Sequence, residues 1–305
     1  MKYPVNRACP LTNESADHVL GYMPAGLVVA ANPTYRPEAL SILGIAPDDE
    51  FPIARSSAGF AFSAWLPDGV FLRRVYDEVV DHDLTVTQEL WYRQFLLDAA
   101  ARLLEAADPT NTPVRALDYG CGYGGLLDLL ACRELVGVGY EPSGAKRVAT
   151  GRRVTLVGST DEIAERGPFD LLICTEVLEH MARPQEAIET LRANAKPGAV
   201  LLVTVPCCTT TEMRAALDGF SSGAPQPFMF NPWEHLNYFR PTDLRGLLAQ
   251  GGFHPFADLG RLRPARLALG ASTGDWRGDL VSALRAGKRL LSAGTSTQLL
   301  CRAVG

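Results

Sequence analysis

Apolar runs of strand length recur at regular intervals between residues 114 and 205. They occupy 114–119, 135–140, 153–157, 169–174 and 199–205. Stretches with helical spacing of apolar residues lie between them, most clearly at 124–133 and 184–195. Strands that alternate with helices in this way form a parallel sheet with helices on both faces. The pattern therefore predicts an α/β domain in this part of the chain.

The last part of the chain continues this pattern. A helix is predicted over 241–250, followed directly by a strand over 253–259. Residues 276–291 again have helical spacing, and 297–304 predict a last strand. The α/β domain is therefore expected to run from about residue 111 to residue 305.

The first part of the chain has no long helical pattern. Residues 1–84 contain many prolines and only short apolar runs. This composition predicts a small, irregular, β-containing module. Thr85 then begins a helix, with Gln88 placed as in a capping box. We expect a linking helix over 85–110, between the module and the α/β domain.

Composition and charge are typical of a soluble cytoplasmic enzyme. The 305 residues can bury a sizeable core, and the net charge of −5 argues against a nucleic acid partner. The most apolar N-terminal stretch, 19–31, is interrupted by Pro24 and follows acidic residues, so neither a signal peptide nor a membrane span is predicted. Seven scattered cysteines indicate reduced thiols. The oligomeric state is left open.

Residues 117–125 carry the most informative motif, Leu-Asp-Tyr-Gly-Cys-Gly-Tyr-Gly-Gly. The motif ends a predicted strand and begins a predicted helix, so its glycines lie in a strand-to-helix turn. Glycine there permits positive φ and lets a ligand approach the backbone, while the N–H groups of the helix start favour a negative group. The turn therefore predicts a site for a small anionic or zwitterionic cofactor.

Two types of cofactor fit the glycine spacing taken alone. Gly120, Gly122 and Gly125 also satisfy the G-x-G-x-x-G spacing of a dinucleotide-binding turn. Glu141 ends the next strand, where a carboxylate can accept hydrogen bonds from ribose hydroxyls in either case. Asp118, two residues ahead of three alternating glycines, is the feature that separates the two types.

The D-x-G-x-G-x-G pattern that begins at Asp118 resembles the class I S-adenosylmethionine-dependent methyltransferases. Later segments strengthen the resemblance: Phe-Asp-Leu-Leu-Ile-Cys-Thr-Glu-Val-Leu-Glu-His-Met at 169–181, Lys-Pro-Gly at 196–198 and Glu-His-Leu-Asn-Tyr-Phe at 234–239. The resemblance implies a Rossmann-like fold with a mostly parallel seven-stranded sheet and an antiparallel terminal strand at one edge. It also implies S-adenosylmethionine as the cofactor.

The resemblance assigns the residues that contact this cofactor. Asp118 and the glycine turn are expected to surround the methionine end, and Glu141 is expected to accept both ribose hydroxyls. The full set of expected contacts is Asp118, Gly120, Cys121, Gly122, Tyr123, Gly124, Glu141, Pro142, Ser159, Thr160, Thr175 and Glu176.

Two parts of this set lie at the ends of later strands. Ser159 and Thr160 occupy the region where the family recognises adenine. Asp161 in the same region fits adenine recognition and the cap of a short helix equally well. Thr175 and Glu176 follow the fourth strand of the domain, where the family approaches the methionine and the transferring methyl group.

A methyltransferase needs a general base only when its acceptor loses a proton. His235 is the best candidate because histidine titrates near neutral pH, with Glu234 to orient it and Tyr238 nearby. A structural role ahead of the last helix fits His235 equally well. His180 is a further candidate for the catalytic residues. Helical spacing in Glu-Val-Leu-Glu-His turns some side chains away from the site, so a structural role fits His180 at least as well.

The N-terminal module resembles the zinc ribbon that precedes some sugar methyltransferase domains, but it lacks the zinc ligands. Cys9 stands alone, Thr12 takes the second ligand position, and residues 55–58 offer no thiolate. His18 and His82 have no spacing typical of a ligand pair. Because a tetrahedral zinc site needs four good ligands, no metal is expected.

Residues 206–233 form a connection too long for a simple turn and are expected to be a substrate lid or insertion. Two roles fit the large apolar side chains of this segment, which can wall the acceptor or anchor the loop to the core. These side chains are Phe220, Phe228, Met229, Phe230 and Trp233.

The function predicted from these features is in-line methyl transfer from S-adenosylmethionine to a small-molecule acceptor. We expect a sugar or specialised metabolite, such as one in natural product biosynthesis, with O-methylation favoured over N- or C-methylation. Two alternatives stay open. One is an NAD(P)-dependent oxidoreductase, and the other is a non-catalytic S-adenosylmethionine-binding protein.

Overall fold

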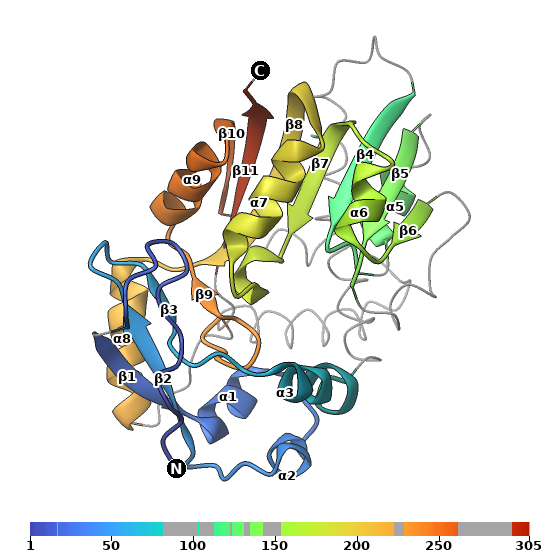
Figure 1. Ribbon diagram of the computed structural model, residues 1–305. Helices are drawn as coiled ribbons and strands as arrows, with labels where there is room; N and C mark the ends of the chain where they lie inside the picture. Colours follow the sequence, from blue (N-terminus) through green and yellow to red (C-terminus); the bar gives the residue numbers. More distant parts are fainter. Residues whose placement is uncertain are drawn as a thin grey trace, which may run out of the picture.

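The computed structural model consists of two bodies, one built on a large sheet and one on a small sheet (Figure 1). It describes residues 1–16, 18–81, 103, 113–122, 124–130, 135–142, 154–222, 229–261 and 295–304. Tyr123, the predicted linking helix apart from Leu103, and the predicted helix at 276–291 lie outside the described residues. In the ranges given, the helices are all too short or too polar to cross a membrane.

The large sheet has seven strands in the order β10-β11-β8-β7-β4-β5-β6. Their bounds are β4 Val114–Tyr119, β5 Leu135–Tyr140, β6 Val154–Val157, β7 Phe169–Thr175, β8 Ala195–Cys207, β10 Phe253–Arg261 and β11 Thr295–Ala303. The five strands from β6 to β8 are parallel, whereas β11 is antiparallel to both β8 and β10. This confirms the predicted Rossmann-like sheet and its antiparallel edge.

Helices cover both faces of the large sheet, as the continuous apolar runs of its strands require. On one face, α7 (Pro184–Ala193) and α9 (Pro241–Gln250) pack their apolar sides on the strands. On the other face, α5 (Gly125–Leu130) buries three leucines against the centre of the sheet. The short helix α6 (Thr160–Ala164) and the 3-10 turn η3 (Leu178–His180) follow β6 and β7.

The smaller body is built on an antiparallel sheet in the order β1-β2-β3-β9. Three of its strands come from the N-terminus, namely β1 (Val19–Pro24), β2 (Glu50–Arg55) and β3 (Ala61–Ser63). The fourth, β9 (Asn237–Tyr238), comes from the segment ahead of α9. Short helices complete the body: α1 Ala25–Ala31, α2 Ala39–Leu43, α3 Gly69–Arg74 and the π-helical turn η1 Val75–Val79.

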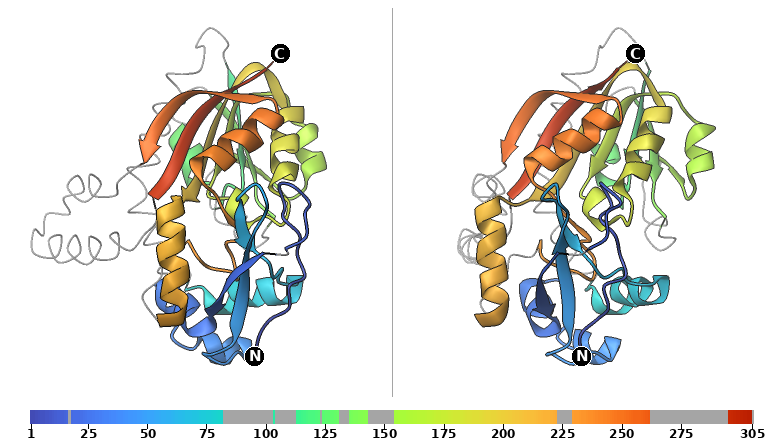
Figure 2. Two further views of the ribbon diagram at one scale, coloured as in Figure 1. Left: turned by 90° about the vertical axis from the view of Figure 1, so that its left-hand side faces the viewer. Right: turned by 60° about the vertical axis from the view of Figure 1, so that its left-hand side comes forward.

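The predicted lid segment is part of this smaller body. Its helix α8 (Thr210–Ser222) lies beside β1, as the views in Figure 2 agree. Met229, Phe230 and Trp233 are almost fully buried in one apolar cluster with β1 and β2. These three side chains therefore anchor the segment to the core. Phe228 lies outside the described residues.

Arg7 fastens the N-terminal segment to both bodies. Its guanidinium donates hydrogen bonds to the carbonyl oxygens of Leu236 and Ala182, at 2.6 and 2.8 Å, and to Oδ1 of Asn237 at 2.8 Å. Burial lowers its pKa to about 10, which still leaves it charged at neutral pH. A buried cation with this many partners holds the loop after η3 and the strand β9 in a fixed relation.

Candidate active site

The glycine motif forms the expected strand-to-helix turn between β4 and α5. Gly120, Gly122 and Gly124 have φ values of 80°, 55° and 78°, which favour glycine. A Cβ atom at Gly120 would lie only 2.4 Å from Cγ2 of Val177. Both conformation and close approach therefore require glycine at position 120. The backbone N–H of Cys121 donates to the carbonyl of Tyr140, which ties the turn to the end of β5.

Two buried carboxyl groups flank this turn. Asp118 is 3% exposed, and its Oδ1 has no hydrogen-bond partner within the described part of the chain. Burial, together with Glu141, raises the pKa of Asp118 to about 7. Glu141 is also buried, and its Oε2 accepts a hydrogen bond of 3.1 Å from the N–H of Gly122. An unpartnered buried carboxyl oxygen fits a ligand that carries positive charge.

The residues expected near adenine begin the helix α6. The hydroxyl of Ser159 accepts the N–H of Glu162 at 3.3 Å, so Ser159 is the N-cap of this helix. Thr160 is the first residue of α6, and Asp161 lies in its first turn. The alternative in which Asp161 caps the helix is therefore wrong. Pro142 is exposed directly after Glu141.

Glu176 follows β7 in an unusual backbone conformation. Its φ of 54° is in the left-handed region, which non-glycine residues adopt rarely. Two hydrogen bonds to β8 hold it there: its N–H donates to the carbonyl of Thr204 at 3.0 Å, and its Oε1 accepts the Thr204 hydroxyl at 2.9 Å. Such conformations persist where the surroundings fix them, often at functional sites. Thr175 directly precedes it at the end of β7.

His180 and His235 lie next to each other, although 54 intervening residues separate them along the chain. Their ring centres are 4.8 Å apart in an edge-to-face arrangement. Nε2 of His180 lies 3.7 Å from Oε1 of Glu179, whose side chain is almost fully buried. The segment that carries His180 is a 3-10 turn and not a regular helix. That turn directs His180 toward His235.

The surroundings of His235 differ from the expected arrangement. Its Nδ1 lies 3.1 Å from the carbonyl oxygen of Met229, which sets the orientation of the ring. The carboxylate of Glu234 instead accepts hydrogen bonds from the hydroxyl of Tyr35 and from the amide of Asn231. Through Tyr35, the carboxylate of Glu234 contacts the smaller body.

Burial lowers the pKa of His235 to about 4. The imidazole is therefore neutral near pH 7, and it is a weak proton acceptor because its pKa lies far below that pH. Tyr238 is directed elsewhere. Its ring packs on Phe230, and its side chain lines a separate cavity of about 270 Å³ beside Cys208 and Arg240.

Tyr76 is a site residue that the sequence did not indicate. It comes from η1 in the smaller body, and its hydroxyl lies 3.4 Å from Nδ1 of His180. Burial raises the pKa of Tyr76 well above its usual range, and the negative charges of Glu234, Glu179 and Glu141 add to this effect. The hydroxyl of Tyr76 therefore interacts electrostatically with Glu179 in the turn after β7 and with Glu141 at the end of β5. No local sequence signal could have found it, because the contact depends on how the two bodies meet.

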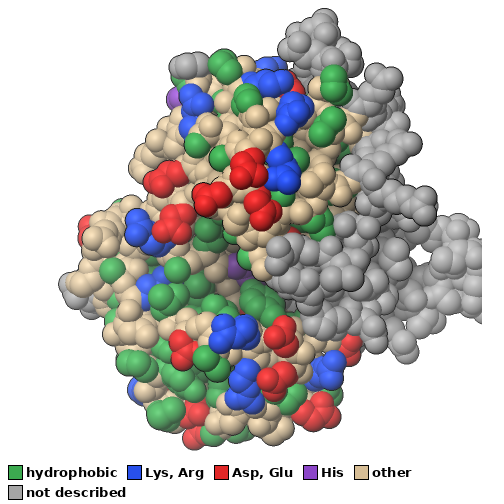
Figure 3. Space-filling model, turned by 45° about the vertical axis from the view of Figure 1, so that its right-hand side comes forward, with side chains coloured by type: hydrophobic (Ala, Val, Ile, Leu, Met, Phe, Trp, Pro, Cys, Tyr) green, Lys and Arg blue, Asp and Glu red, His purple; other side chains and the backbone are tan. Residues whose placement is uncertain are grey.

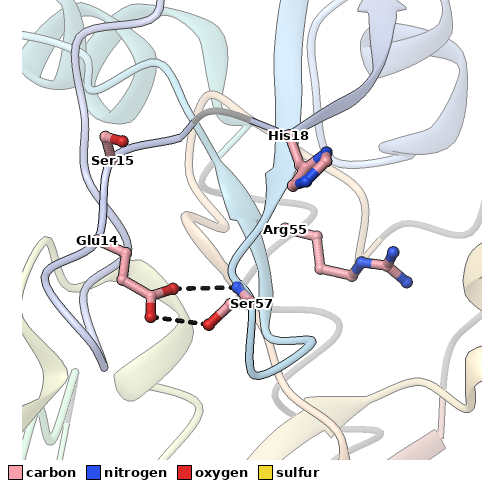
Figure 4. A pocket seen from close by; sticks show the side chains of 5 residues that line it. All are labelled: Glu14, Ser15, His18, Arg55 and Ser57. Carbon is pink, nitrogen blue, oxygen red and sulfur yellow. Dashed lines mark hydrogen bonds between the residues drawn. The ribbon is translucent and has the colours of Figure 1, made fainter.

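The space between the two bodies is hollowed and lined by hydrophobic side chains, with a histidine inside it (Figure 3). A different cavity, of about 280 Å³, lies in the N-terminal module that resembles a zinc ribbon (Figure 4). There the carboxylate of Glu14 accepts two hydrogen bonds, from the N–H and the hydroxyl of Ser57. His18 and Arg55 also line it, and Cys9 is buried nearby in the core.

Comparison with known proteins gives a consistent result. Residues 90–256 match the methyltransferase domain family. The ubiquinone biosynthesis O-methyltransferase of Caulobacter vibrioides is 30% identical over 245 residues, which cover 75% of this chain and 88% of the relative. Its counterpart in Vibrio cholerae serotype O1 is 32% identical over 173 residues, with 48% of this chain and 68% of the relative covered.

A solved structure supports the fold. The 1,6-didemethyltoxoflavin-N1-methyltransferase of Burkholderia thailandensis, solved with 1,6-didemethyltoxoflavin and S-adenosylhomocysteine bound, superposes with a TM-score of 0.51. The superposition covers 83% of this chain and 99% of the methyltransferase chain, and the two sequences are 13% identical. At that identity the likeness concerns the arrangement of strands and helices.

Proposed function

The chain belongs to the S-adenosylmethionine-dependent class I methyltransferases, and we propose that it methylates a hydroxyl oxygen of a small organic molecule. Membership of this family excludes the alternative of an NAD(P)-dependent oxidoreductase. When bound, S-adenosylmethionine supplies an electrophilic methyl carbon attached to a positively charged sulfur. The residues of this chain have two tasks, which are to hold the cofactor and to present an acceptor oxygen in line with that carbon.

The glycine turn and its two carboxyl groups support the first task. Asp118 is buried and has an unpartnered oxygen, so a cationic ligand compensates its desolvation. We assign it, with the glycine turn from Gly120 to Gly124, to the methionine end of the cofactor. We assign Glu141 to the ribose hydroxyls, since a carboxylate can accept two strong hydrogen bonds from a vicinal diol.

The remaining cofactor assignments follow the strand ends of the sheet. Ser159 and Thr160, at the start of α6, are proposed to line the adenine, because ligands in such sheets bind beyond the carboxyl ends of the strands. Thr175 and Glu176 are proposed to lie nearest the transferring methyl group. The fixed left-handed backbone at Glu176 supports a role in shaping this part of the site.

One observation carries the choice of oxygen as the acceptor atom: Glu179, His180 and His235 form an imidazole and carboxylate cluster at the turn after β7. A neutral hydroxyl attacks poorly until it loses its proton, and we assign the acceptance of that proton to His180 beside Glu179, because the buried imidazole of His235 is a weak base. The names of the similar relatives, which are O-methyltransferases of ubiquinone biosynthesis, agree with this choice.

The smaller body is proposed to complete the acceptor side of the site. It supplies Tyr76 directly, and it holds the segment that carries His235 through the hydrogen bonds of Glu234 with Tyr35 and Asn231. We therefore assign the module of residues 1–84, together with the insertion 206–233, to acceptor binding. A small hydroxylated acceptor, such as a sugar or a phenolic specialised metabolite, suits a hollow enclosed by two bodies.

Two measurements test this proposal. Calorimetry with the full chain is expected to show binding of S-adenosylmethionine and no binding of a nicotinamide dinucleotide. Incubation with S-adenosylmethionine and a panel of hydroxylated sugars and phenols is then expected to give a product that is one methyl group heavier by mass spectrometry. Cofactor binding without any methylated product across sugars, phenols and amines would favour a non-catalytic binding protein.

A further inference from the structure

A cavity of about 270 Å³ lies in the smaller body, against helix α8. All four strands of the small sheet contribute to its lining, namely β1 with Leu20, β2 with Arg55, β3 with Ala61 and β9 with Tyr238. The helix α8 contributes three more residues. This volume is near the lower end of the range for ligand pockets, so the cavity suits a small molecule.

The strand β9 separates this cavity from the acceptor side of the methyl-transfer site. Successive side chains of a strand point to opposite faces. The amide of Asn237 donates to the carbonyl oxygens of Leu178 and Met181, at and after the turn η3. The next side chain, Tyr238, lines the cavity. A ligand in the cavity therefore occupies a different place from the proposed acceptor.

Three arginines line the cavity, and its described lining contains no aspartate or glutamate. Arg55 comes from the end of β2, Arg214 from α8 and Arg240 from the position directly ahead of α9. The chain as a whole has a net charge of −5, so this concentration of positive charge is local. A cavity lined by charges of one sign attracts a ligand of the opposite sign.

Two of the three guanidinium groups have no partner within the protein. Among the described residues, the side chains of Arg55 and Arg214 make neither a hydrogen bond nor an ion pair. Figure 4 shows the guanidinium of Arg55 directed away from the carboxylate of Glu14, which already accepts two hydrogen bonds from Ser57. Both guanidinium groups therefore keep all of their donors for a ligand.

Arg240 is held in place at the wall of the cavity. Its Nε and Nη2 donate to the two carboxylate oxygens of Asp243, at 2.8 and 2.7 Å. Nη1 has no partner in the described ranges, and it lies 3.1 Å from the position that a Cβ atom would take at Gly59, which also lines the cavity. Because Asp243 balances the charge of Arg240, this residue contributes a fixed donor. The excess positive charge comes from Arg55 and Arg214.

The rest of the lining is mainly apolar. Met213 and Leu217 share one face of α8 at i,i+4 spacing, and Leu20 lines the cavity with them. Tyr238 adds a buried hydroxyl that has no hydrogen-bond partner in the described part of the chain. A buried polar group is costly unless a partner accepts its hydrogen bond. Guanidinium groups and apolar side chains in one cavity suit a ligand that combines an oxyanion with an apolar group.

From this geometry we propose that the cavity binds a small organic oxyanion, which is a carboxylate or phosphate attached to an apolar group. Arg55 and Arg214 supply the charge, and Nη1 of Arg240 supplies the fixed donor. The planar guanidinium group matches the oxygens of both kinds of anion. The ligand does not take part in methyl transfer, so this site is independent of the proposed function. Because the anion joins α8 to β2 and to the start of α9, it stabilises the folded chain.

Calorimetry with the full chain tests the proposal. The probes are phenyl phosphate, benzoate, inorganic phosphate and uncharged benzyl alcohol. We expect one phenyl-bearing anion to bind per chain, about tenfold or more tightly than inorganic phosphate or benzyl alcohol. The tighter of phenyl phosphate and benzoate identifies the preferred oxyanion. That anion is also expected to raise the melting temperature.

Single substitutions locate the site. Arg55→Gln and Arg214→Gln are each expected to weaken binding of the preferred anion about tenfold, as the loss of a charge-assisted hydrogen bond implies. Both residues are exposed, so the variants are expected to keep the wild-type melting temperature without ligand. Arg73→Gln is the matched control, because Arg73 is also exposed on a helix of the smaller body but does not line the cavity.

Three results would overturn the proposal. One is a wild-type chain that binds both phenyl-bearing anions no more tightly than benzyl alcohol. Another is binding that Arg55→Gln and Arg214→Gln weaken no more than Arg73→Gln does. The third is competitive displacement of the anion by S-adenosylhomocysteine, which places the anion in the methyl-transfer site. A chain that binds the anion as expected but methylates no acceptor supports this proposal and contradicts the proposed function.

Discussion

At the scale of single residues, burial sets the protonation states of the site. Burial and Glu141 raise the pKa of Asp118 to about 7, whereas burial lowers the pKa of His235 to about 4. Near neutral pH the site therefore holds a neutral imidazole together with a carboxyl group close to the middle of its titration. A positively charged ligand at Asp118 favours the ionised form of that carboxyl group.

The raised pKa of Asp118 predicts how stability depends on pH when no cofactor is bound. Because the folded pKa exceeds the unfolded value of 3.8, this group supports the folded state below pH 3.8 and loses that support as pH rises through about 7. The difference corresponds to about 4 kcal/mol. Asp118→Asn is expected to remove this decline in the free energy of unfolding, measured with urea across the same pH range. Equal pH dependence in wild type and variant contradicts the assignment.

Tyr76 predicts a smaller effect, confined to activity. Tyr76→Phe keeps the ring and removes the hydroxyl that lies 3.4 Å from Nδ1 of His180. We expect kcat to fall about tenfold, as the loss of one hydrogen bond to the site implies, with cofactor affinity unchanged in calorimetry. Tyr22→Phe is the control, because Tyr22 lies in β1 beside Lys2. A Tyr76 variant with wild-type kcat shows that the hydroxyl has no part in the site.

At the scale of elements, the turn after β4 and the turn after β7 depend on each other. A methyl group at Gly120 collides with Val177, which directly precedes the turn that carries Glu179 and His180. Gly120→Ala is therefore expected to cost about 3 kcal/mol of unfolding free energy and to weaken cofactor binding. Gly122→Ala has the same kind of φ but open space, so about 1 kcal/mol is expected. Similar losses in the two variants, measured by urea unfolding, count against a steric coupling.

Local signals explain which elements the sequence could predict. The helix α9 has the bounds expected for it, because Pro241 begins it and the carboxylate of Asp243 accepts the N–H of Arg240 at 2.9 Å. The turn η3 has no such signal, so the sequence did not indicate that this segment is a 3-10 turn or that His180 lies beside His235. The strand β9 has only two residues, and its pairing partner lies in β3. Such a strand has no periodicity from which to predict it.

At the scale of the whole molecule, the proposed acceptor side of the site forms where the two bodies meet. The glycine motif, Asp118 and Glu141 follow one another within the α/β domain, and their proximity could be predicted from sequence. The contacts of His180 with Tyr76 and His235 could not, because the first joins residues 104 positions apart and the second joins segments on either side of β8. Long-range packing, rather than local pattern, decides which of the predicted catalytic residues come together.

Arg7 is the residue through which this packing can be tested. Arg7→Met removes the hydrogen bonds that the guanidinium donates to Leu236, Ala182 and Asn237, and the carbonyl of Leu236 keeps only the N–H of Ser63 as a donor among the described contacts. We expect a loss of about 3 kcal/mol in the free energy of unfolding, measured with urea. Arg183→Met is the control, because Arg183 is 74% exposed and its partner Glu186 is 56% exposed. That variant is expected to stay within about 0.5 kcal/mol of the wild type, as for other exposed ion pairs. A small effect at Arg7 shows that the bodies are held together by other contacts.

The proposed methylation of oxygen is tested most directly by the position of the transferred methyl group. The full chain is incubated with S-adenosylmethionine that carries a ¹³C-labelled methyl group, together with acceptors that each offer a hydroxyl, an amine and an acidic carbon. The product is examined by NMR, with Glu141→Gln as a variant expected to lose cofactor binding. We predict a labelled methyl group bonded to oxygen in the wild-type product. A labelled methyl group on nitrogen or carbon contradicts the account.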